Sequence, residues 1–130
     1  MYKKAYPEDL RPKAAVTAVR NWPDGKIKLP EAKAVILECH AAAREAEGKS
    51  AARAAARAIG QCASTIHALT HCAGLMFYGA LALAYDLIGI DAGRNELLLA
   101  AENECRQMEE ALRSISVENE PNPAKIKWKC

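Results

Sequence analysis

The chain has 130 residues, a length that suits one domain with one hydrophobic core. Its 18 basic and 16 acidic residues leave a formal net charge of +2, which is too balanced to indicate a protein that binds nucleic acid or a charged membrane. The hydrophobic fraction is 51%, but alanine supplies much of it. We therefore expect closely packed helices that bury little apolar area per residue, and further burial against a second copy in a homodimer.

The number and spacing of the cysteines indicate whether the protein resides in a reducing or an oxidising compartment. The five cysteines, Cys39, Cys62, Cys72, Cys105 and Cys130, are an odd number and include no C-x-x-C pair. Three of them lie among apolar neighbours in predicted helices, where cysteine behaves as a small hydrophobic residue. The N-terminus, MYKKAYPEDL, lacks the apolar core of a signal peptide. These features predict a protein of the reducing cytoplasm.

The first predicted helix runs from about Asp9 to Asn21, after a polar lead-in over residues 1–8. Asp9 is suited to cap this helix, and Pro12 is tolerated in its first turn. Residues 23–25, Pro-Asp-Gly, predict a turn in which glycine adopts a positive φ.

The second predicted helix runs from about Glu31 to Glu47, with Pro30 at the position where helices often begin. Gly48 is suited to end this helix, and Ser50 is suited to cap the next one. So short a link predicts that the second and third helices are antiparallel neighbours.

Residues 50–88 are the part around which we expect the rest to be built. They contain no proline and almost no charge after Arg57, and alanine and leucine favour helix, so we predict one long helix despite three internal glycines. A helix that is apolar almost all round belongs in the middle of a bundle. One stripe along this helix is small and polar instead of apolar, and its residues are spaced 4, 3, 4, 3 and 4 apart. It consists of Gly60, Ser64, His67, His71, Gly74 and Tyr78.

The weakly charged run over residues 58–85 exceeds the length of a membrane span, but it contains polar side chains that would be costly in lipid. These are Gln61, Ser64, Thr65, His67, Thr70 and His71. We therefore expect no membrane association.

A fourth helix is predicted from about Arg94 to Ser114, with one apolar face and one charged, solvated face. From there on, two prolines and alternating charge over residues 116–130 predict an extended tail. This tail would dock, if at all, through Ile126 and Trp128.

Together these elements predict an all-α fold, a single-domain bundle of about four helices around one long central helix at residues 50–88. We place the helical bundle domain at residues 1–115 and the extended C-terminal tail at residues 116–130.

The central stretch resembles a known family. The family's core pattern is matched by Ala58, Gly60, Gln61, Ala63, Thr65, His67, Thr70, His71, Gly74 and Tyr78. With YPEDLRP at residues 6–12, these motifs resemble the immunity proteins assigned to bacterial polymorphic-toxin systems, the immunity protein five-like domain family. The resemblance covers about residues 5–90, and the G-Q-x-x-x-T-x-H-x-x-T-H spacing is its informative part.

The resemblance implies a cognate protein toxin as the partner and assigns no catalytic residues. Relatives carry an extra amphipathic helix before the YPEDxRP turn. Its absence here would leave one side of the bundle uncovered, and a homodimer would cover that side.

His67 and His71 are the strongest functional hint in the sequence. At i and i+4 they project from one helix face close enough to share a metal ion such as zinc. Zinc would need one or two more ligands, and a bare H-x-x-x-H lacks the glutamate of the metalloprotease motif. Two other interpretations stay open: buried histidines that hydrogen-bond neighbouring helices, or a pocket for a small ligand or anion. The further candidate ligands are Glu38, Cys39, His40 and a carboxylate of the fourth helix.

Gly60 and Gly74 indicate that something approaches the helix closely, with a second helix favoured over a bound molecule. The candidate ligand-binding set is therefore His67, His71, Ser64, Tyr78, Gly60 and Gly74, and the candidate metal ligands are His67 and His71. Arg53 and Arg57 are expected to pair with Glu45, Glu47 or water rather than to bind phosphate.

No catalytic set is convincing, because Cys62 and Cys72 lie off the histidine stripe and no acidic residue orients a Ser64–His67 pair. We expect an immunity-type binding protein that occludes a cognate toxin. The alternatives are a bundle that binds a small ligand or metal through His67 and His71, and an enzyme that acts through the same histidines.

Overall fold

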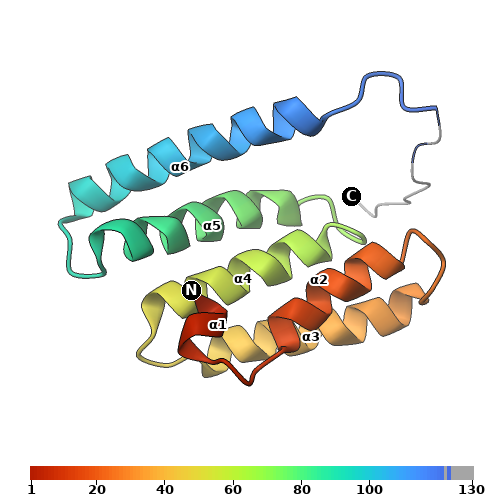
Figure 1. Cartoon of the computed structure of the whole chain (residues 1–130), viewed down its shortest axis with the longest axis horizontal. Coiled ribbons are helices and arrows are strands. Elements are labelled where there is room, and N and C mark those ends of the chain that lie inside the picture. Colours follow the sequence, from red (N-terminus) through yellow and green to blue (C-terminus); the bar gives the residue numbers. More distant parts are fainter. Residues whose placement is uncertain (122, 124–130) are drawn as a thin grey trace.

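The computed structural model describes residues 1–121 and 123, and every regular element in that part of the chain is an α-helix. This confirms the predicted all-α fold. The helices, shown in Figure 1, are α1 (Tyr2–Ala5), α2 (Arg11–Asn21), α3 (Leu29–Glu45), α4 (Ser50–Ser64), α5 (His71–Ile88) and α6 (Arg94–Ile115).

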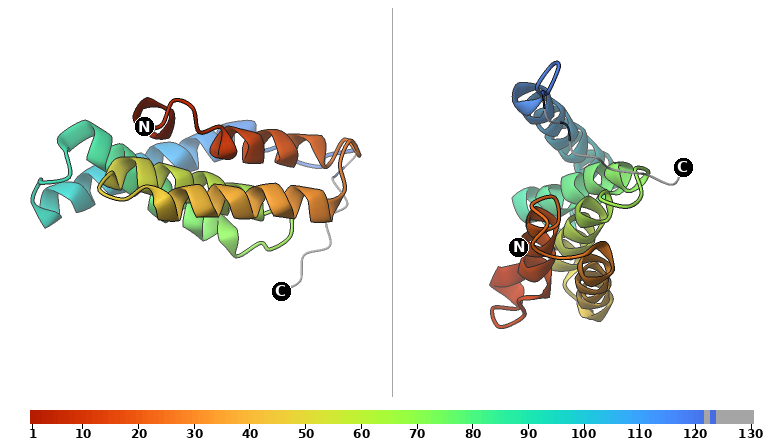
Figure 2. Two further views of the ribbon diagram at one scale, coloured as in Figure 1. Left: turned by 90° about the horizontal axis from the view of Figure 1, so that it is seen from below. Right: turned by 90° about the vertical axis from the view of Figure 1, so that its right-hand side faces the viewer.

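From α2 onward, successive helices run back and forth and pack as antiparallel neighbours. Helices α2 and α3 form one layer, α4 packs on both of them, α5 packs on α4, and α6 packs on α5 alone. The short α1 lies against α4. Seen along the helices, α6 stands at the far side of the molecule from α2 and α3 (Figure 2). The histidine segment lies at one end of this stack, in the link between α4 and α5 and at the start of α5 (Figure 1).

The prediction of one helix over residues 50–88 is wrong. Helix α4 ends at Ser64 and α5 begins at His71, and the chain reverses between them. In the link, backbone amides bond three residues back, as in His67 to Ser64 at 3.1 Å and Cys72 to Leu69 at 3.0 Å. Side chains compete for the backbone as well, since the Thr65 hydroxyl donates to the carbonyl of Cys62 at 2.7 Å.

The length of a continuous helix explains why the chain folds back here despite its helix propensity. A straight helix over residues 50–88 would be about 58 Å long. A compact domain of this length has a radius of gyration of about 14 Å, so a large part of such a helix would protrude into water. Folding back at residues 65–70 lets α4 and α5 bury their alanine-rich faces against each other instead.

The core is built mostly from alanine, as the composition predicted. One buried cluster joins α2, α3 and the end of α4 through residues that include Ala15, Ile36 and Ile66. A second joins α1, α3 and α4 through Tyr2, Ala42, Ala43, Ala46, Ala52 and Ala56. Small side chains at these positions bring the helix backbones close together.

Several local predictions need correction. Residues 2–5 are not a plain lead-in, because they form α1 and bury Tyr2. Neither Asp9 nor Ser50 caps a helix, because the N-cap residues of α2 and α4 are Leu10 and Lys49 and neither helix has a side-chain cap. Gly48 has a φ of +67° in the link, the conformation that favours glycine, but α3 has already ended at Glu45.

Two further predictions concern the C-terminal tail and the membrane. The proposed docking of the tail through Ile126 and Trp128, and the role of Cys130, lie outside the described residues. In the described part, α5 has the length and composition to cross a membrane, with a mean hydropathy of 1.3 over 18 residues of which 22% are buried. Core helices of other proteins meet the same criterion, and here α5 packs between α4 and α6.

Candidate functional site

The chain's three histidines gather where α3, α4 and α5 meet. His40 comes from α3, His67 from the link, and His71 is the first residue of α5. The rings of His67 and His71 have their centroids 5.8 Å apart and are inclined by 57°. The break in the predicted helix therefore preserves their proximity and adds a third imidazole from another helix.

His71 is held by Gln61 of α4, through a hydrogen bond of 2.6 Å between Nδ1 and Oε1. The same glutamine explains Gly74. A Cβ at that position would lie 2.6 Å from Gln61 side-chain atoms, so only glycine fits without displacing the amide. Gln61 is absent from the predicted site residues, although its place in the family motif is a signal that could have identified it.

Gly60 likewise makes room for a side chain of a neighbouring helix, on the side of α4 that faces α3. A Cβ there would lie 2.7 Å from Cε1 and 2.8 Å from Nδ1 of His40, so the imidazole packs directly on the glycine backbone. Ser64 Oγ lies 3.3 Å from His40 Nε2 and donates to the carbonyl of Gly60 at 2.8 Å. Both glycines thus accommodate a polar side chain of a neighbouring helix, which agrees with the helix contact expected for them.

The electrostatic environment of this cluster is basic. Burial lowers the pKa of His40 below its ordinary value, and the positive charges of His71, Arg44 and Arg57 lower it further. Burial also lowers the pKa of His67, with smaller contributions from neighbouring basic groups. Both imidazoles are therefore neutral at pH 7. Among the described residues, His67 Nδ1 is buried without a hydrogen-bond partner.

Metal binding would rest on His67 and His71 alone. Within residues 1–121 and 123, no group of three or more His, Cys, Asp or Glu side chains is arranged to hold a metal ion. Two imidazoles supply half of a tetrahedral zinc site. The zinc hypothesis remains a prediction that a binding measurement must test.

Two buried nucleophilic groups near the cluster, Ser64 and Cys39, are engaged in other hydrogen bonds. Ser64 is 1% exposed and uses its proton on a backbone carbonyl. The Cys39 thiol is buried and donates to the carbonyl of Ala56 at 3.4 Å, and burial raises its pKa to about 11. Neither side chain is placed to present a reactive oxygen or sulfur to a substrate.

Tyr78 lies away from the histidines and contacts Arg57 of α4. The Arg57 guanidinium donates to the tyrosine hydroxyl at 3.4 Å and lies 5.5 Å from the ring centroid. Arg53 donates through Nε to the carbonyl of Ala46 at 3.2 Å. The ion pair expected with Glu45 is not formed, because that carboxylate binds Arg11 at 2.6 Å.

The six predicted ligand-binding residues thus divide between separate contacts. His67 and His71 face each other, Gly60 and Ser64 face His40, Gly74 faces Gln61, and Tyr78 faces Arg57. The set therefore lies along a seam between α3, α4 and α5, where its members have different contact partners.

Comparison with known proteins identifies the family. A family model described as "Imm-5 like putative immunity protein" matches residues 1–111, which is most of the chain. No curated protein and no solved structure gives a significant match. The YPEDLRP motif, the glycines and the histidines all lie within the matched range, and the chain belongs to the Imm-5 like putative immunity protein family.

Proposed function

We propose that this protein neutralises a cognate protein toxin in the bacterial cytoplasm by binding to it and covering its active surface. Membership of the immunity-protein family over residues 1–111 carries the proposal. The four described free thiols, Cys39, Cys62, Cys72 and Cys105, are consistent with a reducing compartment. Inhibition by occlusion requires a stable surface, and the packed α2–α3–α4 layers supply one.

Growth rescue tests this proposal. A toxin gene found beside the gene for this protein supplies the candidate toxin, which is expressed from an inducible promoter with and without the protein. We expect wild-type protein to restore growth and to co-purify with the toxin. A toxin that kills equally in both cultures, together with no co-purification, would contradict the proposed function.

We also propose that the protein acts as a homodimer formed through α5 and α6. No described residue of α6 is buried, and α6 contacts α5 alone. Large apolar side chains remain exposed on both helices, including Phe77 at 72%, Leu99 at 70% and Ile115 at 73%. Obligate homodimer interfaces are more apolar than other protein surfaces, and an exposed area of this kind marks an interaction site.

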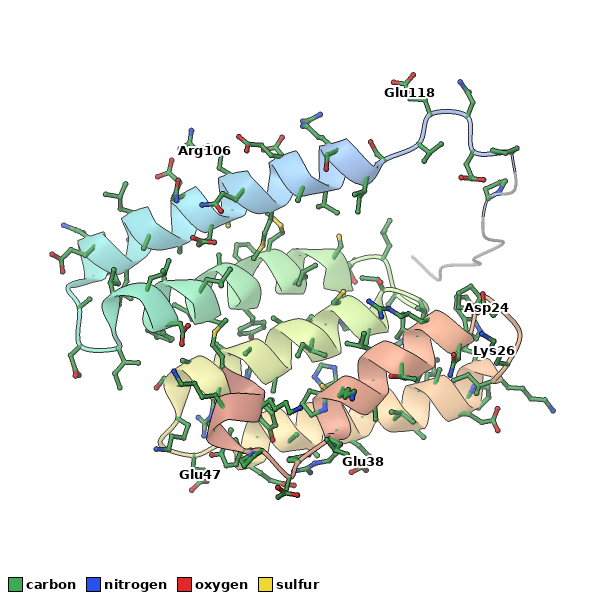
Figure 3. All side chains as sticks on the ribbon, viewed as in Figure 1. Asp24, Lys26, Glu38, Glu47, Arg106 and Glu118 are labelled. Atoms are coloured by element: carbon green, nitrogen blue, oxygen red, sulfur yellow. The ribbon has the colours of Figure 1, made fainter. Side chains whose placement is uncertain are left out.

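The sequence of α6 supports helix-on-helix packing at this surface. Apolar residues recur at intervals of three and four along one stripe, which is typical of a helix covered by another helix. The stripe consists of Leu98, Ala101, Cys105, Met108, Leu112 and Ile115. Met108 reaches Gly79 of α5, whereas Leu98 and Leu112 remain more than half exposed. The opposite face is charged, and Arg106 points away from α5 (Figure 3).

Light scattering during size-exclusion chromatography tests the dimer. We expect twice the chain mass for wild type and the mass of one chain for Leu112→Glu. Gln107→Glu adds the same charge to the exposed polar face of α6 and should leave the dimer intact. A monomeric wild-type protein would contradict the proposed dimer and leave this surface available to the toxin.

A further inference from the structure

A pocket of about 220 Å³ lies between α4 and α5, on the side away from the histidine cluster toward the start of α4. It combines two arginines with two tyrosines and a small apolar floor. The lining residues are Ser50, Arg53, Ala54, Arg57, Tyr78, Leu81 and Tyr85. Neither the family match nor the proposed function assigns a role to this pocket.

The two arginines carry uncompensated charge. Arg53 and Arg57 are half-buried and four residues apart on one face of α4. Their bonds are to a backbone carbonyl and a tyrosine hydroxyl, and neither forms an ion pair with any carboxylate of the described residues. Like charges at i and i+4 destabilise a helix, so this arrangement is costly unless an anion lies between them.

No carboxylate of the described residues lines this pocket. Residues 48–85, which include all of α4 and most of α5, contain no Asp or Glu. Asp86 lines an adjoining pocket that shares Ser50 with this one and also contains Lys4 and Lys49. Glu38 and Glu47 lie along the edge of the molecule away from α5 (Figure 3). Burial lowers the pKa of His40, and the charge of Arg57 contributes to this shift together with those of His71 and Arg44.

We propose that this pocket binds a carboxylate group carried on a short carbon chain. Guanidinium groups hold carboxylates through paired N–H donors, and the uncapped start of α4 at Ser50 adds the positive end of a helix dipole. Leu81, Ala54 and the tyrosine rings provide apolar contacts for the carbon chain, which a phosphate ion would not use. The proposal goes beyond toxin neutralisation, because it assigns a ligand chemistry to a pocket to which the family match gives no role.

Proton–nitrogen NMR of the full chain, titrated with glutarate, tests the binding site. We expect the Nε–Hε resonances of Arg53 and Arg57 to shift saturably, with a dissociation constant on the order of millimolar. The response should weaken as salt is added. Inorganic phosphate should shift the same resonances less at equal concentration.

Variants make the result specific. Arg57→Gln should lose the saturable response. Arg57→Lys keeps the positive charge but lacks the paired N–H donors of the guanidinium, and it should weaken the response. Arg20→Gln removes an exposed arginine of α2 and should leave the response unchanged. The absence of a saturable shift in a folded wild-type protein, an equal response in Arg57→Gln, or a stronger response to phosphate would each overturn the proposal.

Growth rescue then distinguishes the two sources of the carboxylate. If it is an acidic side chain of the toxin, Arg57→Gln loses neutralisation whereas Arg20→Gln retains it. If it is a free small molecule, both variants neutralise as wild type does. Failure of wild-type protein to neutralise any toxin would refute the proposed function and leave the glutarate result standing.

Discussion

The contact between Gly60 and His40 makes a sharp prediction about stability. Replacing Gly60 with alanine in an isolated helix should stabilise it by about 1 kcal/mol. In this fold the new Cβ would lie 2.7 Å from Cε1 and 2.8 Å from Nδ1 of the His40 ring. Carbon atoms pack best at a separation of about 3.5 Å or more, so the ring must move by about 0.8 Å.

That movement has two costs. Overpacking of this kind destabilises a core by about 1–3 kcal/mol. Displacing the ring also weakens the 3.3 Å contact between His40 and Ser64, at about 1 kcal/mol. After the gain in helix propensity, Gly60→Ala should lower the free energy of unfolding by about 1–3 kcal/mol.

A double-mutant cycle isolates the steric cause. In a His40→Ala background there is room for the added methyl group, so Gly60→Ala should become neutral or stabilising. Urea denaturation followed by circular dichroism at pH 7.5 measures all four proteins. An equal loss of stability in both backgrounds would refute the contact, as would a stabilising Gly60→Ala in the wild-type background.

Three further predictions follow from the same structure. Because the folded-state pKa values of His40 and His67 lie below the ordinary 6.5, the unfolded chain binds more protons below that pH. Stability should therefore be full above pH 7 and fall toward pH 5.5, by up to about 1.4 kcal/mol per pH unit for each histidine. A flat urea-denaturation profile over this range, or an equally steep one in His40→Gln, would contradict the pKa assignment. Asp9 accepts hydrogen bonds from Arg11 and from the hydroxyl of Tyr2, so Asp9→Asn should lower the free energy of unfolding by about 1.5–3 kcal/mol. A loss below about 0.5 kcal/mol in urea denaturation would show that these hydrogen bonds contribute little to stability. With only two imidazoles as ligands, zinc should not stabilise the fold, and a melting temperature that falls on chelation would restore the metal-site hypothesis.

The sequence was informative wherever local chemistry determines structure. Prolines, Gly48 and the apolar periodicity located α2, α3 and α6 to within about three residues, because breakers and capping signals act over a single turn. The turn at residues 65–70 was missed because its residues carry no proline or glycine. What breaks the helix there is the packing of α4 on α5, which no local signal reveals.

The candidate site shows the same limit. Close approach was correctly predicted at Gly60 and Gly74, although the single helical stripe that was expected to join them is interrupted between Ser64 and His71. The partners came from elsewhere: His40 from α3 for Gly60, and Gln61 from α4 for Gly74. Long-range neighbours of this kind depend on how helices pack, and a single helical wheel cannot supply them.

Isothermal titration calorimetry of the purified protein against a candidate toxin from a neighbouring gene tests the central claim most directly. We expect tight, saturable binding with a fixed stoichiometry, and toxin activity that falls in proportion to the fraction bound. No heat of binding with an active toxin and a folded immunity-family protein, or binding that leaves the toxin fully active, would contradict neutralisation by occlusion.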